Sequence, residues 1–137
     1  MEDCLFCKIV KKEISAEIVY ENEVAIGLLD VHPKAPGHTM VIPKNHVATI
    51  LNLPENKTGP FFIAVKNATR MLQKALVPDG FNIGLNHGKD GGQTIDHLHV
   101  HIIPRYKGDG GTSMHGIVDN PPQESLQEIK EKILQLK

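Results

Sequence analysis

Tryptophan is absent from this chain of 137 residues, and aromatic residues make up only 4% of it. The core must therefore be mainly aliphatic. Only two cysteines are present, spaced Cys4-x-x-Cys7, which excludes a framework of disulfides and favours metal or redox use in a reducing compartment. Neither sign of charge dominates, because 15 basic side chains stand against 16 acidic ones. A general nucleic-acid binder normally has a basic excess, so we do not expect one here.

Long hydrophobic runs are also missing, since no apolar run approaches the ~20 residues of a membrane-spanning helix. The sequence starts with the acidic Met1-Glu2-Asp3, unlike a secretory signal. We therefore expect a cytoplasmic protein with no membrane contact. No internal repeat is visible, and the length suits a single domain over residues 1–137, with a helical extension over residues 121–137.

The chain's most informative stretch is His97-Leu98-His99-Val100-His101-Ile102-Ile103. Histidine and aliphatic residues alternate with a period of two, which predicts a strand with all three imidazoles on one face. A glycine-rich loop with amide and hydroxyl side chains precedes it, and such a loop can bring backbone N–H groups close to an anion. Together these features indicate phosphate chemistry.

Two simpler interpretations of the histidines remain open. A lone histidine on a strand is usually a satisfied core residue, although three in register are less easily explained in this way. Alternatively, the histidines bind metal. On a straight strand His97 and His101 lie about 13 Å apart, whereas zinc–nitrogen bonds measure about 2.0–2.1 Å. Neighbouring histidines could chelate together, but the whole row could not without a severe bend.

Periodicity outlines the remaining elements. Alternation predicts strands over residues 18–21, 24–31, 38–42 and 81–86, and apolar spacings of three and four predict a helix over residues 59–77. A second helix should carry Pro121 and Pro122 in its first turn. Its apolar stripe should consist of Leu126, Ile129, Ile133 and Leu136.

The histidine row matches the His-φ-His-φ-His-φ-φ signature of the histidine triad nucleotide-binding proteins, where φ is apolar. Further blocks follow in the family's order, at residues 4–9, 29–31, 35–38, 41–46 and 104–105. The chain therefore resembles this family over nearly its whole length, and most closely its phosphoramidase branch with bacterial and archaeal relatives. The resemblance implies an α+β fold with a five-stranded, mostly antiparallel sheet, a packed central helix and a C-terminal helix. It also implies a homodimer with a continuous sheet.

The resemblance implies a role for each histidine. His99 would attack the α-phosphorus of a nucleoside 5′-phosphate derivative while its other ring nitrogen donates to the main-chain carbonyl of His97. His101 and His38 would contact the same phosphate, since an imidazole near its ordinary pKa can act both as nucleophile and as charged partner. The remaining phosphate oxygens would be held, without a catalytic metal, by Gln93, Thr94 and backbone N–H groups near Gly92.

Nucleotide-binding positions also follow from the resemblance. Asp30 would accept hydrogen bonds from the ribose, although a carboxylate there often only caps a turn. Asn86 would contact the nucleotide, although asparagine is also a common turn residue. The apolar walls around a purine base would come from Leu5, Phe6, Ile9, Leu28 and Val31.

The cysteine pair has its own alternatives. Two cysteines two residues apart are half of a zinc site, and the resemblance supplies His46 and His97 as the other half. Cys4, Cys7, His46 and His97 would then form a closed, structural zinc site. The plainer interpretation is two reduced cysteines near a chain end, and thioredoxin-like chemistry is less favoured because no βαβ pattern surrounds the pair.

The sequence thus predicts a hydrolase that acts at the α-phosphate of adenosine 5′-phosphoramidates or related AMP conjugates through a nucleotidyl-histidine intermediate. Within the same class, the alternative is a dinucleoside polyphosphate hydrolase. From other classes, a non-catalytic nucleotide-binding scaffold and a metallohydrolase with catalytic zinc on the histidine row remain open.

Overall fold

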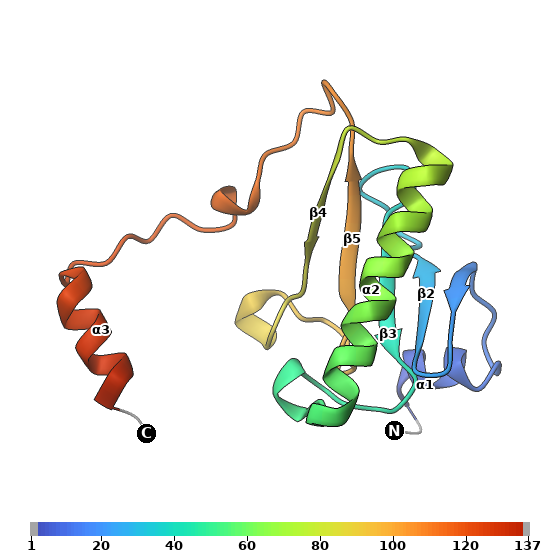
Figure 1. Ribbon diagram of the computed structural model, residues 1–137, viewed down its shortest axis with the longest axis horizontal. Helices are drawn as coiled ribbons and strands as arrows, with labels where there is room; N and C mark the ends of the chain where they lie inside the picture. Colours follow the sequence, from blue (N-terminus) through green and yellow to red (C-terminus); the bar gives the residue numbers. More distant parts are fainter. Residues whose placement is uncertain (1–2, 136–137) are drawn as a thin grey trace.

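The computed structural model describes residues 3–135 as an α+β fold around one sheet (Figure 1). The five strands lie in the order β1-β2-β3-β5-β4, and every neighbouring pair is antiparallel. This confirms the predicted fold class. Within the described residues, no helix is both long and apolar enough to cross a membrane. The main elements are α1 (Leu5–Val10), β1 (Ile18–Glu21), β2 (Ala25–Leu29), β3 (Thr39–Pro43), α2 (Glu55–Leu76), β4 (Gly80–Gly84), β5 (Val100–Arg105) and α3 (Leu126–Gln135).

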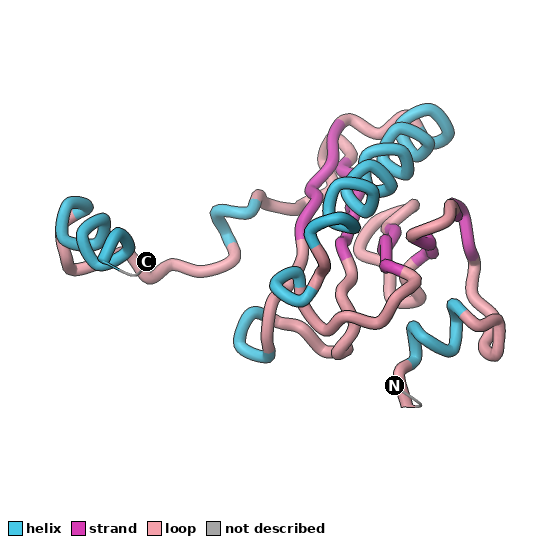
Figure 2. The backbone as a smooth tube through the Cα atoms, turned by 60° about the horizontal axis from the view of Figure 1, so that its bottom comes forward, coloured by secondary structure: helices cyan, strands magenta, loops and turns pink. Residues whose placement is uncertain are grey.

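The inner strands bury side chains on both faces of the sheet, and a different helix packs against each face. The long helix α2 lies along one face, and the short helix α1 lies at the other (Figures 1 and 2). On β3, Val41 belongs to the core beneath α2, whereas its neighbour Ile42 packs with Phe6 of α1. Alternate residues of one strand thus serve two separate cores.

The histidine row is less regular than the sequence predicts. The strand was expected over residues 97–103, but β5 begins only at Val100, which pairs with Val41 of β3. Continuing this antiparallel ladder would place Leu98 opposite Pro43, which has no N–H to donate. Instead, the N–H of Leu98 donates to the carbonyl oxygen of Val47 at 2.8 Å.

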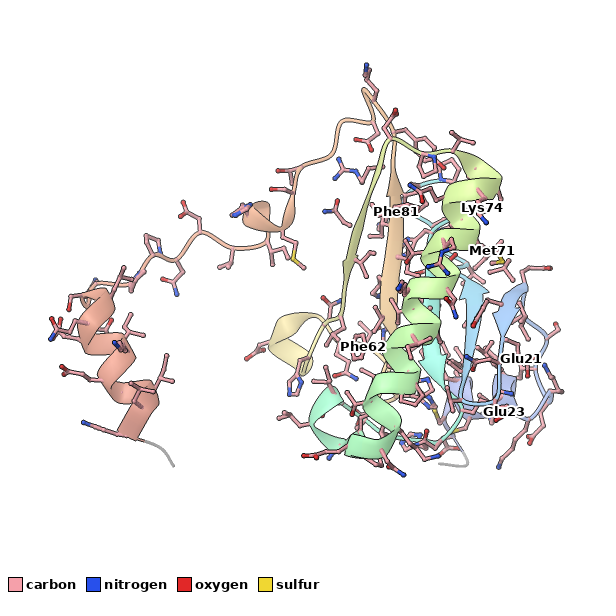
Figure 3. All side chains as sticks on the ribbon, in the orientation of Figure 1. Glu21, Glu23, Phe62, Met71, Lys74 and Phe81 are labelled. Atoms are coloured by element: carbon pink, nitrogen blue, oxygen red, sulfur yellow. The ribbon has the colours of Figure 1, made fainter. Side chains whose placement is uncertain are left out.

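Several other helices and strands begin or end at residues that differ from those predicted. Helix α2 begins at Glu55, four residues before the predicted start, because its polar first turn has no apolar periodicity to reveal it. Phe62, labelled on α2 in Figure 3, belongs to the helix's more exposed side and is 37% exposed. Strands β2 and β4 are shorter than predicted, and the third strand starts at Thr39 rather than at His38.

Beyond Lys107 the chain leaves the body as an extended arm that ends in α3 (Figures 1 and 2). The predicted helix exists, but its start was wrong. It begins at Leu126 after a capping box, in which the backbone N–H of Glu128 donates to the hydroxyl of Ser125 and that of Ser125 donates to the carboxylate of Glu128. Pro121 and Pro122 precede this cap, and Leu136 of the predicted stripe lies outside the described residues. The predicted homodimer stays a prediction, with β4 as the edge strand on the arm's side.

Candidate active site

The three histidines do share one face of the chain, as their alternation predicts. The intervening Leu98, Val100 and Ile102 are at most 2% exposed and belong to the core beneath α2. His97 and His99 are buried on the opposite side, and His101 is half-buried. The ring centroids of His99 and His101 are 5.2 Å apart. Two imidazoles are therefore close enough to act on one substrate group.

His99 is held in one tautomer by the backbone. Its Nδ1 lies 2.7 Å from the carbonyl oxygen of His97. A carbonyl only accepts, so Nδ1 carries the proton and Nε2 keeps a free lone pair. The ring of Phe6 meets that of His99 edge-on at 5.2 Å and limits its movement. The lone pair of Nε2 on His99 is therefore available to a ligand on this face.

His38 and His101 form a directed hydrogen-bond chain. The backbone N–H of Lys34 donates to Nδ1 of His38 at 3.1 Å, so His38 carries its proton on Nε2. That Nε2 lies 2.9 Å from Nδ1 of His101, which must therefore accept. The remaining proton of a neutral His101 sits on Nε2, where it is free to donate to a substrate.

Burial keeps this pair neutral. Desolvation, followed by the neighbouring His99 and His38, lowers the pKa of His101 to about 4. Burial also lowers the pKa of His38, although the Asp30 carboxylate opposes this effect. At pH 7 His101 is therefore uncharged, and an arriving phosphate would restore its affinity for a proton.

Asp30 faces the same pair. Its Oδ2 lies 3.4 Å from Nε2 of His38 and 3.9 Å from Nδ1 of His101. Its Oδ1 accepts from the backbone N–H of His32 at 2.9 Å, so the carboxylate does cap the turn after β2. The three side chains have the composition of a metal site. A metal on Nε2 of His38 would have to displace the proton that the Lys34 hydrogen bond fixes there, so the pair suits a proton chain better than metal ligation.

The glycine-rich loop is braced from within. The side-chain oxygen of Gln93 accepts from the backbone N–H of Gly88 at 2.9 Å. Its amide nitrogen donates to the carbonyls of Ala48 and Ile95, at 2.7 and 3.0 Å. The side chain predicted to hold phosphate therefore already uses its hydrogen-bonding groups to fix the loop.

The other predicted loop residues lie at its surface. Asn86 and Thr94 are exposed, and the amide of Asn86 reaches the carbonyl of Gly92 at 3.5 Å. Gly92 adopts a φ of 98°, which glycine tolerates best. A Cβ atom there would meet the side chain of Asn86 at 3.4 Å, an ordinary contact, so the positive φ is what favours glycine. Any other residue at this position would be strained by the backbone conformation.

The predicted base walls divide into two groups. Phe6, Ile9 and Leu28 are at most 5% exposed and pack together in the core beside α1. Leu5 and Val31 are 42% and 82% exposed. The first group forms a fixed apolar floor, and the second offers surface that a ligand can cover.

The structure also brings the four predicted metal ligands together. One donor atom from each of Cys4, Cys7, His46 and His97 lies within 4.8 Å of the others. Sγ of Cys7 is 3.2 Å from Nδ1 of His46 and 3.6 Å from Nδ1 of His97, and Sγ of Cys4 is 3.4 Å from the latter. Tetrahedral zinc, with its usual bond lengths, separates sulfur from nitrogen by about 3.6 Å. The donor set therefore fits zinc.

A second contact prepares His97 for such a role. Its Nε2 lies 2.9 Å from the carbonyl oxygen of Pro43, which fixes the proton there and leaves the lone pair of Nδ1 toward the cysteines. Burial lowers the pKa of His97 to about 4, which also favours the neutral, metal-binding form. Burial raises the pKa of Cys7, so the thiol of the metal-free protein stays protonated.

Sequence reasoning missed two contributors. The backbone N–H of Lys34 sets the tautomer of His38, and the carbonyl of Pro43 sets that of His97. Main-chain groups leave little trace in a sequence, although the missing N–H of Pro43 does indicate that its strand pairing ends there.

Known proteins resemble this chain over most of its length. The HIT domain pattern matches residues 11–108. A HIT-like protein of Methanocaldococcus jannaschii is 44% identical over 128 residues, which are 93% of this chain and 98% of that protein. The adenosine 5′-monophosphoramidase HNT1 of Saccharomyces cerevisiae is 35% identical over 89% of this chain and 72% of its own length. The crystal structure of SMU.412c from Streptococcus mutans UA159 is 37% identical and superposes with a TM-score of 0.86, covering 98% of this chain and 85% of that one.

Proposed function

The chain belongs to the HIT domain family, and from this premise we propose that it hydrolyses adenosine 5′-phosphoramidates or related AMP conjugates at the α-phosphate. The observation that carries the proposal is the 2.7 Å contact between Nδ1 of His99 and the carbonyl of His97. It leaves Nε2 of a neutral imidazole as a nucleophile beside the His38 and His101 pair. A relative of this chain is named as an adenosine 5′-monophosphoramidase, which supports the choice of substrate.

In the first step, Nε2 of His99 would form a bond to the α-phosphorus as the phosphorus–nitrogen bond to the leaving amine breaks. The bound phosphate's negative charge raises the proton affinity of His101, so this residue can bring the proton that the amine takes away. In the second step, water attacks the nucleotidyl-histidine. Its hydroxyl goes to phosphorus to give AMP, and its other proton returns to His101.

We also propose a structural zinc ion in the Cys4, Cys7, His46 and His97 cluster. The donor separations and the Pro43 contact support it. The ion would tie α1 to His97, the first residue of the histidine row, without itself touching the substrate.

Turnover decides between an enzyme and a binding module. The protein is incubated, without added metal, with an adenosine 5′-phosphoramidate bearing an amine, and AMP release is compared with that by His99→Ala. A diadenosine polyphosphate is tested in parallel as the alternative substrate. Removing the nucleophile should lower the rate by several orders of magnitude, whereas the exposed His115→Ala serves as the matched control.

Calorimetric AMP binding by His99→Ala checks that the variant is folded. If the wild-type protein binds AMP but releases none from either substrate, the hydrolase proposal is wrong and a nucleotide-binding module replaces it. Faster cleavage of the polyphosphate than of the phosphoramidate would instead change the substrate class.

A further inference from the structure

The two cysteines are placed to react with each other as well as to bind metal. Cys4 caps the start of α1, and its Sγ accepts from the backbone N–H of Cys7 at 3.4 Å. The two sulfur atoms lie within 4.8 Å of each other, so side-chain rotation can bring them to the bond length of a disulfide, about 2.05 Å. Because the chain has no other cysteine, this is the one disulfide that can form within it.

The two thiols differ in their exposure to solvent. Cys7 is 8% exposed, whereas Cys4 is half-buried and follows the exposed Asp3. An oxidant from solution therefore meets Cys4 first, and Cys7 lies behind it as a resolving thiol. An accessible cysteine beside a resolving one is the usual arrangement of redox-sensing cysteines.

Helix α1 connects the cysteine pair to the histidine row. Between the two cysteines lies Phe6, which is 1% exposed. Its ring meets the ring of His97 edge-on at 5.7 Å and that of His99 at 5.2 Å. Ile9 is buried beside it in the core on this side of the sheet. A displacement of α1 therefore moves a side chain that contacts His99.

We propose that Cys4 and Cys7 form a redox-sensitive site, at which a small-molecule disulfide oxidises the cysteine pair, releases the zinc and loosens α1. The inference rests on the zinc site proposed above and does not depend on the hydrolase reaction. As zinc ligands both cysteines are thiolates, which is the form that attacks disulfides. The same two side chains would thus hold the metal and respond to the oxidant.

The reaction consists of two thiol–disulfide exchanges. Sγ of Cys4 bonds to one sulfur of the oxidant, whose other sulfur leaves as a thiolate. Sγ of Cys7 then bonds to Sγ of Cys4, and the second thiolate leaves. Two electrons have thus passed from the cysteines to the oxidant, and its sulfur–sulfur bond is replaced by one within α1.

Oxidation removes two of the four metal ligands. His46 and His97 remain as only half of a closed tetrahedral set, so the metal is released. The attachment of α1 then depends on the packing of Phe6 and Ile9 alone. Because Phe6 belongs to the predicted floor of the base pocket, a looser α1 should weaken AMP binding. By linkage, bound AMP should strengthen zinc binding by the same factor.

Treatment of the zinc-loaded protein with glutathione disulfide tests the proposal. Zinc release is followed with a chromophoric indicator, and intact mass spectrometry reports the state of the thiols. Wild type should release its zinc and lose the mass of two hydrogens relative to the metal-free reduced chain, and dithiothreitol with added zinc should reverse both changes. In calorimetry the oxidised protein should bind AMP about fivefold more weakly than the zinc-loaded protein.

Two variants separate the steps. Cys7→Ser keeps the accessible thiol but lacks the resolving one, so it should stop at a mixed disulfide with glutathione. His46→Ala keeps both thiols but lacks one metal ligand, so it should form the same internal disulfide as wild type. Both are assayed below the lower Tm expected for a protein without zinc.

Retention of zinc and both thiols in wild type would overturn the proposal. A stable mixed disulfide in wild type, or a disulfide between two chains, would also overturn it, because Cys7 would then not resolve Cys4. Unchanged AMP affinity after zinc release would refute the coupling through α1. If metal analysis of the purified protein finds no zinc, the zinc site and this inference are both wrong, whereas a failure to release AMP from the substrates would refute only the hydrolase proposal.

Discussion

Removal of the metal should destabilise this protein without abolishing its chemistry. The proposed zinc ligands come from α1, from the segment after β3 and from the start of the histidine row. Helix α1 also buries Phe6 and Ile9 against the sheet, so its attachment depends on both packing and metal. Chelation should loosen α1 first.

The expected magnitude follows from binding linkage. Free metal at a thousand times its dissociation constant stabilises the folded state by about 4 kcal/mol. For a domain of this size each kcal/mol moves Tm by about 3–4 °C. Chelator should therefore lower Tm by about 12–16 °C, as measured by differential scanning calorimetry. Cys7→Ser should melt near the chelated value and respond little to chelator.

Turnover below the lowered Tm should persist, because His99 depends on the carbonyl of His97 and not on a metal-bound water. Metal analysis should find one zinc per chain, and X-ray absorption should show two sulfur ligands at about 2.3 Å and two nitrogen ligands at about 2.0–2.1 Å. An unchanged Tm in chelator would refute the zinc site. Loss of turnover with an unchanged Tm would instead indicate a catalytic metal.

Three further predictions concern individual side chains. Val77→Gly should raise the free energy of unfolding by about 1 kcal/mol in urea titrations, because Val77 ends α2 in the left-handed region, at a φ of 49°. In metal-free protein the pKa values of His97 and His101 are lowered from 6.5 to about 4. The unfolded chain then binds more protons between these values, so stability should fall as pH drops from 6.5 to 4, by up to about 1.4 kcal/mol per pH unit for each histidine. Asp30→Asn should weaken binding of AMP about tenfold in calorimetry. The 2′,3′-dideoxy analogue of AMP should bind wild type and Asp30→Asn with equal affinity. If the substitution weakens binding of AMP and of the analogue equally, a ribose contact is excluded.

Much of the site follows from the sequence, because strand alternation and cysteine spacing are local patterns. The period of two correctly puts the histidines on one face and Leu98, Val100 and Ile102 in the core. The family resemblance correctly brings His46 to the cysteine pair, which spacing alone does not specify.

The remaining features depend on long-range contacts that leave no periodic signal. Two hydrogen bonds connect Lys34, His38 and His101, which lie up to 67 positions apart in the sequence. The first of these bonds is donated by a backbone N–H. The side chain of Gln93 braces the loop through the carbonyl of Ala48, a contact that no spacing in the sequence indicates, and its predicted role toward phosphate stays a prediction. The arm begins where the apolar pattern ends, so periodicity could predict α3 but not its separation from the body, which Figure 3 shows with its side chains.

The stereochemical course at phosphorus tests the central claim most directly. A phosphoramidate with a chiral thio-substituted α-phosphorus is hydrolysed in isotopically labelled water, and the configuration of the product is determined. Attack by His99 followed by attack by water gives two inversions, so the account predicts net retention. Net inversion would show a single displacement by water and would contradict the nucleotidyl-histidine mechanism.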